Sequence, residues 1–298
     1  MMNIGFYFNR LYYKDITSLK QMEEKKQKDE MKEKNLEMTR FSYEEDDRVK
    51  VSQYYLKGNT SPFCLTTNYP GLFTGAGMGH EAKITGELNL GFYFDYTTGL
   101  PVIPGSTIKG VLRSAFPQWD NHKKTPSKIK NAKMRYIYSL IGGVDWDELN
   151  DVEKGIQKNR IIKIEKEIFD GEIGGENLSV YDRDIFLDAY ISKATTKKPT
   201  PDCILGTDSI TPHKKEGMTY SQSLLKNPNP IPFLKVLPDV QFRFEFKLKN
   251  HTKSDSDLLD QDAKEALFKQ ILTDLGIGAK TNVGYGQFTD TSSDNRDM

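Results

Sequence analysis

Cysteine, histidine and tryptophan are scarce in this chain of 298 residues, which contains 2, 4 and 2 of them. Cys64 and Cys203 lie far apart and at no metal-site spacing, which argues against a disulfide framework and against zinc. The histidines also have no second ligand at helical spacing. We therefore expect no metal, no cofactor and a reducing compartment.

Long hydrophobic runs and an excess of one charge are also missing. No apolar run reaches the ~18 residues that a membrane-spanning helix needs. The N-terminus, MMNIGFYFNRLYY, has no small-residue cleavage site of the kind that ends a signal peptide. Basic and acidic residues number 42 each, which argues against indiscriminate polyanion binding but allows a local basic groove. We expect a cytoplasmic protein without membrane contact.

Composition divides the chain into three parts. Residues 1–50 begin with aromatics and continue with Lys and Glu, which predicts a partly helical extension with a charged, solvent-facing surface. Residues 51–290 form the main domain. A basic insertion is expected around 117–175, because residues 121–135 hold six Lys or Arg and no acid. The polar residues 291–298 are predicted to be a disordered tail.

Periodicity in the main domain predicts both strands and helices. Residues 240–249 alternate apolar and polar side chains, which indicates a strand of a half-exposed antiparallel sheet. Residues 256–276 carry an i, i+4 apolar stripe that indicates a helix, and 106–116 predict a shorter one. We expect a long loop at 192–217 and an irregular proline-rich connector at 227–239. The predicted fold class is α+β, a ferredoxin-like (RRM-like) split βαβ antiparallel sheet with long insertions and a glycine-rich loop.

The residues that could perform catalysis do not form a recognisable catalytic motif in the sequence. His80 and His213 could act as general bases on a ribose hydroxyl. Four aspartates could also act on RNA: Asp182, Asp184, Asp188 and Asp208. Their spacing does not group them, so a solvent-facing or structural role is favoured for each, and we predict that the chain is not an enzyme.

The start of the short helix is a candidate anion site. Ser106 can serve as its N-cap, and Lys109 and Arg113 follow on the polar side. No acid occurs from residue 96 to 119, so the positive end of the helix dipole is unbalanced, and Gly105 permits close approach of an anion. An amphipathic helix whose cations only face solvent explains this helix equally well.

The segment GIGAKTNVGYGQF, residues 276–288, is the second candidate. Its glycines permit positive φ angles and close approach of a partner backbone. The lysine can neutralise a phosphate, the asparagine can donate to a phosphate or a base, and the tyrosine can stack on a base. A tight helix-to-strand turn is the alternative, but four glycines, a lysine and an asparagine exceed what such a turn needs. The loop residues assigned to RNA are Gly278, Lys280, Asn282, Gly284 and Tyr285.

These two segments resemble the two signatures of RAMP proteins, the repeat-associated RNA-binding superfamily of CRISPR systems. They read IPGSTIKGVLRSAF at 103–116 and GIGAKTNVGYGQF at 276–288. FLDAYI at 186–191, DSITPHKK at 208–215 and NPIPFLKV at 229–236 resemble the sixth-subunit family of the Cmr (type III-B) effector complex. The resemblance covers roughly residues 60–290 in order.

The resemblance implies a non-catalytic structural subunit that binds guide RNA (crRNA) in an antiviral type III-B effector complex. It implies a place capping the backbone filament near the 3′ part of the guide. The implied partners are crRNA, possibly target RNA, other RAMP subunits and the small helical subunit, in a hetero-oligomer. In the first motif, Ser106, Lys109 and Arg113 would line the RNA path.

Two alternatives stay open. One is a stand-alone RAMP endoribonuclease that processes guide precursors, with His80 or His213 as the base. The other is a protein-only structural cap whose glycine-rich loop contacts a neighbouring subunit.

Overall fold

A seven-stranded antiparallel sheet forms the centre of the main domain. The computed structural model describes residues 3–43, 61–74, 84–90, 92–118, 126–142, 145–197, 201–210 and 230–290. The sheet has the order β12-β1-β11-β8-β4-β3, and β7 also pairs with β11. Its strands are β1 (Ser61–Thr67), β3 (Tyr93–Phe94), β4 (Pro101–Ile103), β7 (Ile185–Phe186), β8 (Ala189–Ala194), β11 (Val240–Lys247) and β12 (Phe288–Thr289).

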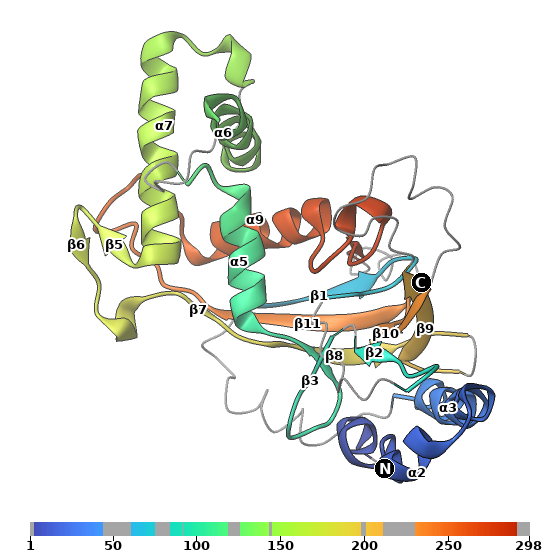
Figure 1. The fold of residues 1–298 in the computed structure, drawn as a ribbon. Helices are drawn as coiled ribbons and strands as arrows, with labels where there is room; N and C mark the ends of the chain where they lie inside the picture. The colour runs from blue at the N-terminus through green and yellow to red at the C-terminus, as the bar shows by residue number, and fades with distance from the viewer. Residues whose placement is uncertain are drawn as a thin grey trace, which may run out of the picture.

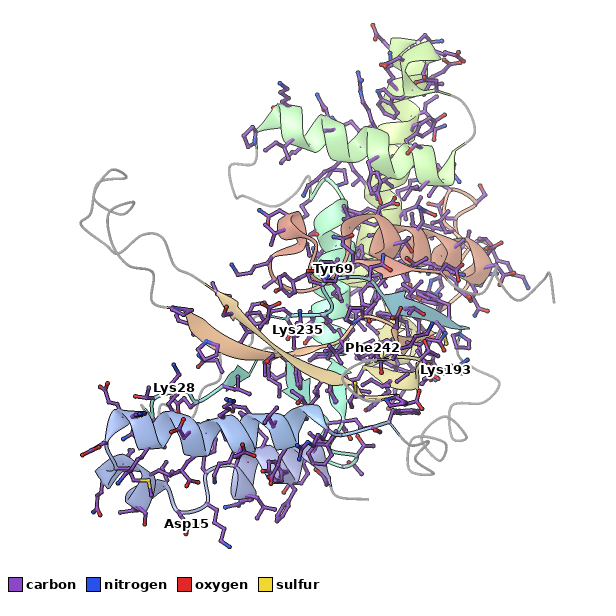
Figure 2. The ribbon with its side chains drawn as sticks, turned by 90° about the vertical axis from the view of Figure 1, so that its right-hand side faces the viewer. Asp15, Lys28, Tyr69, Lys193, Lys235 and Phe242 are labelled. Carbon is purple, nitrogen blue, oxygen red and sulfur yellow. The ribbon has the colours of Figure 1, made fainter. Side chains whose placement is uncertain are left out.

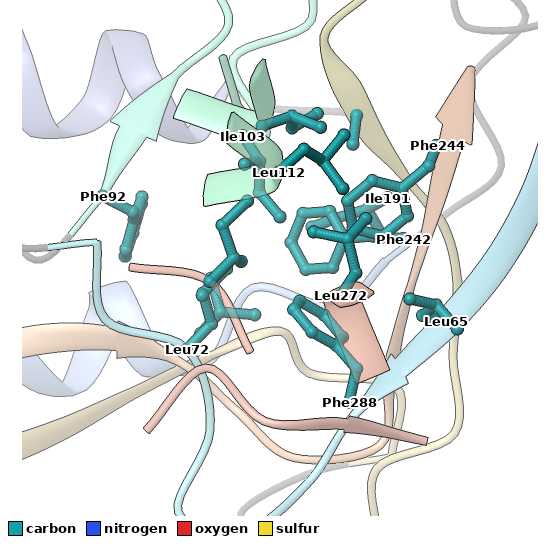
Figure 3. Packing of buried hydrophobic residues seen from close by; sticks show 14 of the residues in the cluster. Leu65, Leu72, Phe92, Ile103, Leu112, Ile191, Phe242, Phe244, Leu272 and Phe288 are labelled. Atoms are coloured by element: carbon teal, nitrogen blue, oxygen red, sulfur yellow. The ribbon is translucent and has the colours of Figure 1, made fainter. Parts of the chain in front are cut away.

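Two helices lie on the same face of this sheet (Figure 1). Helix α5 (Gly105–Ala115) lies in the chain between β1 and β8, and α9 (Gln261–Leu275) connects β11 to β12. Every second residue of β11 faces them, because successive side chains of a strand point to opposite faces. Phe242 and Phe244 are fully buried with Leu272 and Phe288, which puts the core between the sheet and the two helices (Figure 3).

The predictions for β11, α5 and α9 are confirmed, with small differences at the ends of the helices. Helix α9 ends before Gly276, which has a φ of +67° and a ψ of −175°, a backbone conformation that favours glycine. Helix α5 begins one residue earlier than predicted. Its N-cap is Pro104 and not Ser106, because the residue before the helix must have extended backbone and Pro104 has a ψ of 139°.

A second sheet was not predicted. It has the order β2-β10-β9, with β2 (Asn89–Leu90), β9 (Leu205–Ile210) and β10 (Ile231–Val236). The expected loop at 192–217 and the expected connector at 227–239 were therefore wrong over β9 and β10. The last four residues of β10 are all buried, so this strand lacks the polar alternation that would have identified it.

The N-terminal segment is helical, and Tyr7, Phe8 and Tyr12 in it are buried whereas Phe6 is exposed. It contains α1 (Ile4–Phe6), η1 (Tyr7–Leu11), α2 (Ile16–Gln21) and α3 (Glu24–Thr39), and α3 contacts β9. Tyr12 is fully buried, and its hydroxyl donates to Asn35 Oδ1 at 2.5 Å and accepts from the backbone N–H of Leu88 at 2.9 Å. The charged residues of α3 cover the outside of this packed segment.

The basic insertion forms a helical arm that extends away from the main sheet (Figure 1). Its elements are α6 (Ser127–Ile141), η2 (Trp146–Glu148), α7 (Asp151–Glu165), η3 (Lys166–Asp170), the hairpin of β5 (Glu172–Ile173) and β6 (Glu176–Asn177), and η4 (Val180–Asp182). Asn150 and Glu153 form a capping box at the start of α7, which fixes where this helix begins.

A buried ionic network joins the arm to the main domain. The ammonium of Lys264 on α9 is fully buried and donates to Glu167 Oε1 at 2.6 Å and to Asp184 Oδ2 at 2.8 Å. It also donates to the backbone carbonyl of Lys249 at 2.9 Å. His251 Nδ1 lies 2.7 Å from the same Glu167 oxygen. Four segments distant in sequence thus share one buried cation.

Replacing Lys264 with methionine is expected to destabilise the fold strongly. The change keeps an unbranched side chain one atom shorter but leaves two buried carboxylates without their ammonium partner, which costs about 3–5 kcal/mol. Denaturant unfolding of the full chain measures this loss. The exposed Lys20 of α2 provides the control, because Lys20→Met should change the free energy of unfolding by less than about 0.5 kcal/mol. Equal effects of the two substitutions would contradict the structural role of Lys264.

The loss of unfolding free energy in the Lys264→Met variant, relative to the wild type, should become smaller as the pH is lowered. Burial raises the pKa of Asp184 above its ordinary value, although Lys264 opposes this rise. A carboxyl group with a raised folded-state pKa binds more protons in the folded chain, so stability falls as pH rises through that window. Without Lys264 the pKa rises further. The free-energy gap to the wild type, measured by denaturant unfolding, should therefore be smaller at mildly acidic than at neutral pH; a gap independent of pH would refute this.

Candidate nucleic-acid interface

The start of α5 is neutralised from within the chain. The backbone N–H of Gly105 donates to Asp188 Oδ1 at 2.7 Å, so an acid 83 positions away occupies the helix N-terminus. A Cβ on Gly105 would lie 2.2 Å from the carbonyl oxygen of Phe186, so glycine is required there for packing against β7. The prediction of an unbalanced positive end was therefore wrong, because it counted only acids close in sequence. Ser106 is exposed on the first turn.

The two cations of α5 have different surroundings. The guanidinium of Arg113 forms two contacts with Asp170, at 2.9 and 3.1 Å, and lies over the ring of Phe169. Lys109 Nζ lies 5.4 Å from the ring centroid of Phe186, and burial, reinforced by the charge of Arg113, lowers the pKa of Lys109. Arg113 thus ties α5 to the arm, and Lys109 is the better candidate for an external anion.

The glycines of the loop after α9 serve its own packing. Gly278 has a φ of +103°, and a Cβ there would lie 2.5 Å from the carbonyl oxygen of Phe73. At Gly286, with a φ of +68°, a Cβ would lie 1.9 Å from the carbonyl oxygen of Ile277. Backbone hydrogen bonds of 2.7–2.8 Å join Ala279 to Phe73 and Gly286 to Gly71. The tight-turn alternative therefore explains these glycines, and the loop is fixed against residues 71–73.

The rigid loop presents two polar side chains to solvent. Lys280 has a left-handed backbone, with a φ of +59°, and is exposed. Asn282 lies on the short helix η5 (Thr281–Val283) and is also exposed. Gly284 follows this helix with a φ of +98° and packs beside Pro70. A cation and an amide donor are therefore held in fixed positions at the surface, as a phosphate-binding loop requires.

Tyr285 is engaged inside the protein and not turned outward. Its hydroxyl donates to Asp208 Oδ2 at 2.6 Å, and its ring contacts those of Phe73 and Phe233. Burial, followed by the bond to Asp208, raises the pKa of Tyr285. Lys235 Nζ also donates to Asp208 at 2.7 Å, and these bonds lower the pKa of Asp208 although burial opposes them. This cluster joins the loop to the second sheet, a contact that sequence reasoning missed.

The two candidate sites lie at opposite ends of α9. Lys109 interacts electrostatically with Asp184, the partner of Lys264 in the first turn of α9. The glycine-rich loop follows the other end of this helix, which is about 22 Å long for its 15 residues. An RNA that contacts both sites must therefore span the length of the helix.

The polar face of the main sheet is rich in acids near Tyr190. Burial raises the pKa of Tyr190, and the negative charges of Asp95, Asp188 and Glu245 raise it further. Arg243 lies opposite Tyr190 in the sheet and pairs with the buried Glu245, so this part of the polar face carries charges of both signs.

Several predicted residues lie outside the described part of the chain. They include His80, His122 and His213, the Thr-Pro-His element of 208–215 and the tail 291–298. Within the described ranges no group of three His, Cys, Asp or Glu side chains is placed to hold a metal ion. Among the helices described, none is both long and apolar enough to cross a membrane.

Residues 64–289 match the sequence profile of the RAMP superfamily, a range that includes both motifs and the loop just described. The chain belongs to the RAMP superfamily. This confirms the family predicted from the two motifs. Comparison with curated protein sequences finds no significant match.

Three solved structures illustrate the structural likeness. A chain of the type III-B Cmr-beta complex bound to cognate target RNA is 22% identical, with a TM-score of 0.50, over 86% of this chain and 69% of that one. Cmr6 from Pyrococcus furiosus is 23% identical, with a TM-score of 0.38, over 78% and 97%. A chain of the type III-A Csm–crRNA–target RNA complex is 14% identical, with a TM-score of 0.26, over 68% and 52%. Of these three, the first supports a shared α+β fold.

The structural role of the loop glycines leads to a test of stability. Gly286→Ala should lower the free energy of unfolding by more than about 1 kcal/mol, because the new methyl group meets the backbone of Ile277 at a positive φ. Gly155→Ala in α7 is the matched control: its Cβ meets no atom within 4 Å, and the change should stabilise the helix by about 0.5–1 kcal/mol. Thermal unfolding of both variants measures these changes. An unchanged stability in Gly286→Ala would show that the loop is not packed as described.

Proposed function

We propose that this RAMP protein is a non-catalytic subunit of a type III CRISPR effector complex, with the Cmr6-like role of holding guide RNA near the end of the backbone filament. The observation that carries the proposal is the surface of the glycine-rich loop, where Lys280 and Asn282 are exposed on a backbone fixed by hydrogen bonds. The likeness to a chain of the type III-B Cmr-beta complex bound to target RNA supports it.

The order of the core strands supports the finer assignment of a ferredoxin-like domain. Strands β12, β1, β11 and β8 are neighbours in that order, and all three pairings are antiparallel. Helices α5 and α9 connect β1 to β8 and β11 to β12. Two such βαβ units with interleaved strands are what the split βαβ arrangement consists of. The second sheet, the N-terminal helices and the arm are additions to this core.

The mechanism that we propose is recognition of the RNA backbone. Phosphate contacts position a nucleic acid without reading its sequence, which suits a subunit that must accept any guide. Lys280 and Asn282 provide one contact, and Lys109 provides a second at the other end of α9. Arg113 contributes less, because Asp170 already neutralises its charge.

The proposal is tested by the salt dependence of RNA binding. The full chain is titrated onto a fluorescein-labelled single-stranded 20-nucleotide RNA at several salt concentrations. Each phosphate contact to a single strand contributes about 0.7 to the slope of log K against log salt. A Lys109→Ala, Lys280→Ala double variant should therefore bind more weakly and lose about 1.4 from that slope. The exposed Lys20→Ala serves as the control and should match the wild type.

Retention of guide RNA in the native assembly gives the decisive second readout. The tagged double variant should purify with its partner subunits but with less short RNA than the wild type. Normal RNA retention together with an unchanged salt slope would overturn the RNA-binding proposal and favour a purely protein-contacting cap. Cleavage of precursor RNA by the wild-type chain alone would overturn the non-catalytic assignment.

A further inference from the structure

A tight turn next to the glycine-rich loop holds an exposed aromatic ring. The backbone N–H of Asn68 donates to Gln287 O at 2.9 Å, and that of Gly71 donates to Asn68 O at 2.7 Å. Leu72 and Val236 exchange two further backbone hydrogen bonds, at 2.9 and 3.1 Å. Tyr69 lies at the tip of this turn, and 85% of its surface is exposed. The backbone is thus fixed while the large side chain remains accessible.

The turn and the loop form one surface. The Cδ atom of Pro70 lies 3.2 Å from the position of a Cβ on Gly284, and the backbone N–H of Gly286 donates to Gly71 O at 2.8 Å. Asn282 is two residues from Gly284, so their Cα atoms are at most about 7.6 Å apart. Figure 2 shows Tyr69 on the turn near the end of α9. The turn that carries the exposed ring therefore lies directly beside the segment that carries the exposed amide.

We propose that Tyr69 is a base-stacking residue, on which one unpaired base of the bound RNA lies while its phosphate contacts Lys280 or Asn282. This inference rests on the proposed RNA-binding function and deepens it. An exposed aromatic ring beside a cationic loop is the combination that binds single strands without sequence preference. The fixed turn keeps the entropic cost low, because little backbone freedom is lost on binding.

Tyr69 takes the role that sequence reasoning assigned to Tyr285. The hydroxyl of Tyr285 is bound to Asp208, and its ring packs against Phe73 and Phe233. Tyr69 was missed because it lies more than 200 positions before the loop in the chain, and only the pairing of β1 with β12 brings them together.

The test compares four full-length proteins on the same labelled single-stranded RNA. They are the wild type, Tyr69→Ala, Tyr69→Trp and Tyr96→Ala. Tyr96 is the matched control, because it is fully exposed in the turn between β3 and β4. Loss of one stacking contact should weaken binding by about 5- to 150-fold in Tyr69→Ala, whereas Tyr69→Trp should bind at least as well as the wild type.

The salt dependence separates stacking from charge. In Tyr69→Ala the affinity should fall at every salt concentration while the slope of log K against log salt stays that of the wild type. RNA carrying 4-thiouridine should also crosslink to the peptide that contains residue 69. Wild-type affinity in Tyr69→Ala, or a loss equal to that of Tyr96→Ala, would overturn the stacking role while RNA binding itself stands. A wild-type chain that binds no RNA, alone or in its assembly, would overturn both proposals.

Discussion

The buried ammonium of Lys264 is the interaction on which the arrangement of the main domain depends. It joins α9, the element η3 of the arm, the segment before β7 and the segment after β11 through Glu167, Asp184 and the carbonyl of Lys249. A buried cation is tolerated only when its partners are held in place, so each of these segments restricts the others. The position of α9, and with it the start of the glycine-rich loop, follows from this network.

Around that network, several charges near the candidate sites are compensated within the chain. Asp188 occupies the N-terminus of α5, Asp170 pairs with Arg113, and Asp208 binds both Lys235 and Tyr285. Other lysines remain exposed, including Lys25 and Lys32 of α3 and Lys280 of the glycine-rich loop, and Lys280 lies on a backbone that is fixed by hydrogen bonds.

The glycine-rich loop combines two explanations that were opposed at the start. Its glycines are required by close contacts with Phe73 and within the loop, so geometry accounts for them. The same contacts make the loop rigid, and rigidity is what allows exposed side chains to bind a flexible strand at low entropic cost. We infer that the structural and the binding roles of this loop are consequences of one packing arrangement.

Local patterns in the amino-acid sequence were sufficient for β11, α5, α9 and the family motifs. Alternation, helical spacing and turn residues depend on side chains within a few positions of each other, so they are legible without a structure. The strand β10 was missed because burial on both faces removes its alternation. The cap on α5, the burial of Lys264 and the position of Tyr69 were decided by the tertiary structure alone. Each depends on residues about 80 to more than 200 positions apart, whose proximity is set by strand pairing and by packing between helices, and neither is encoded in any short segment.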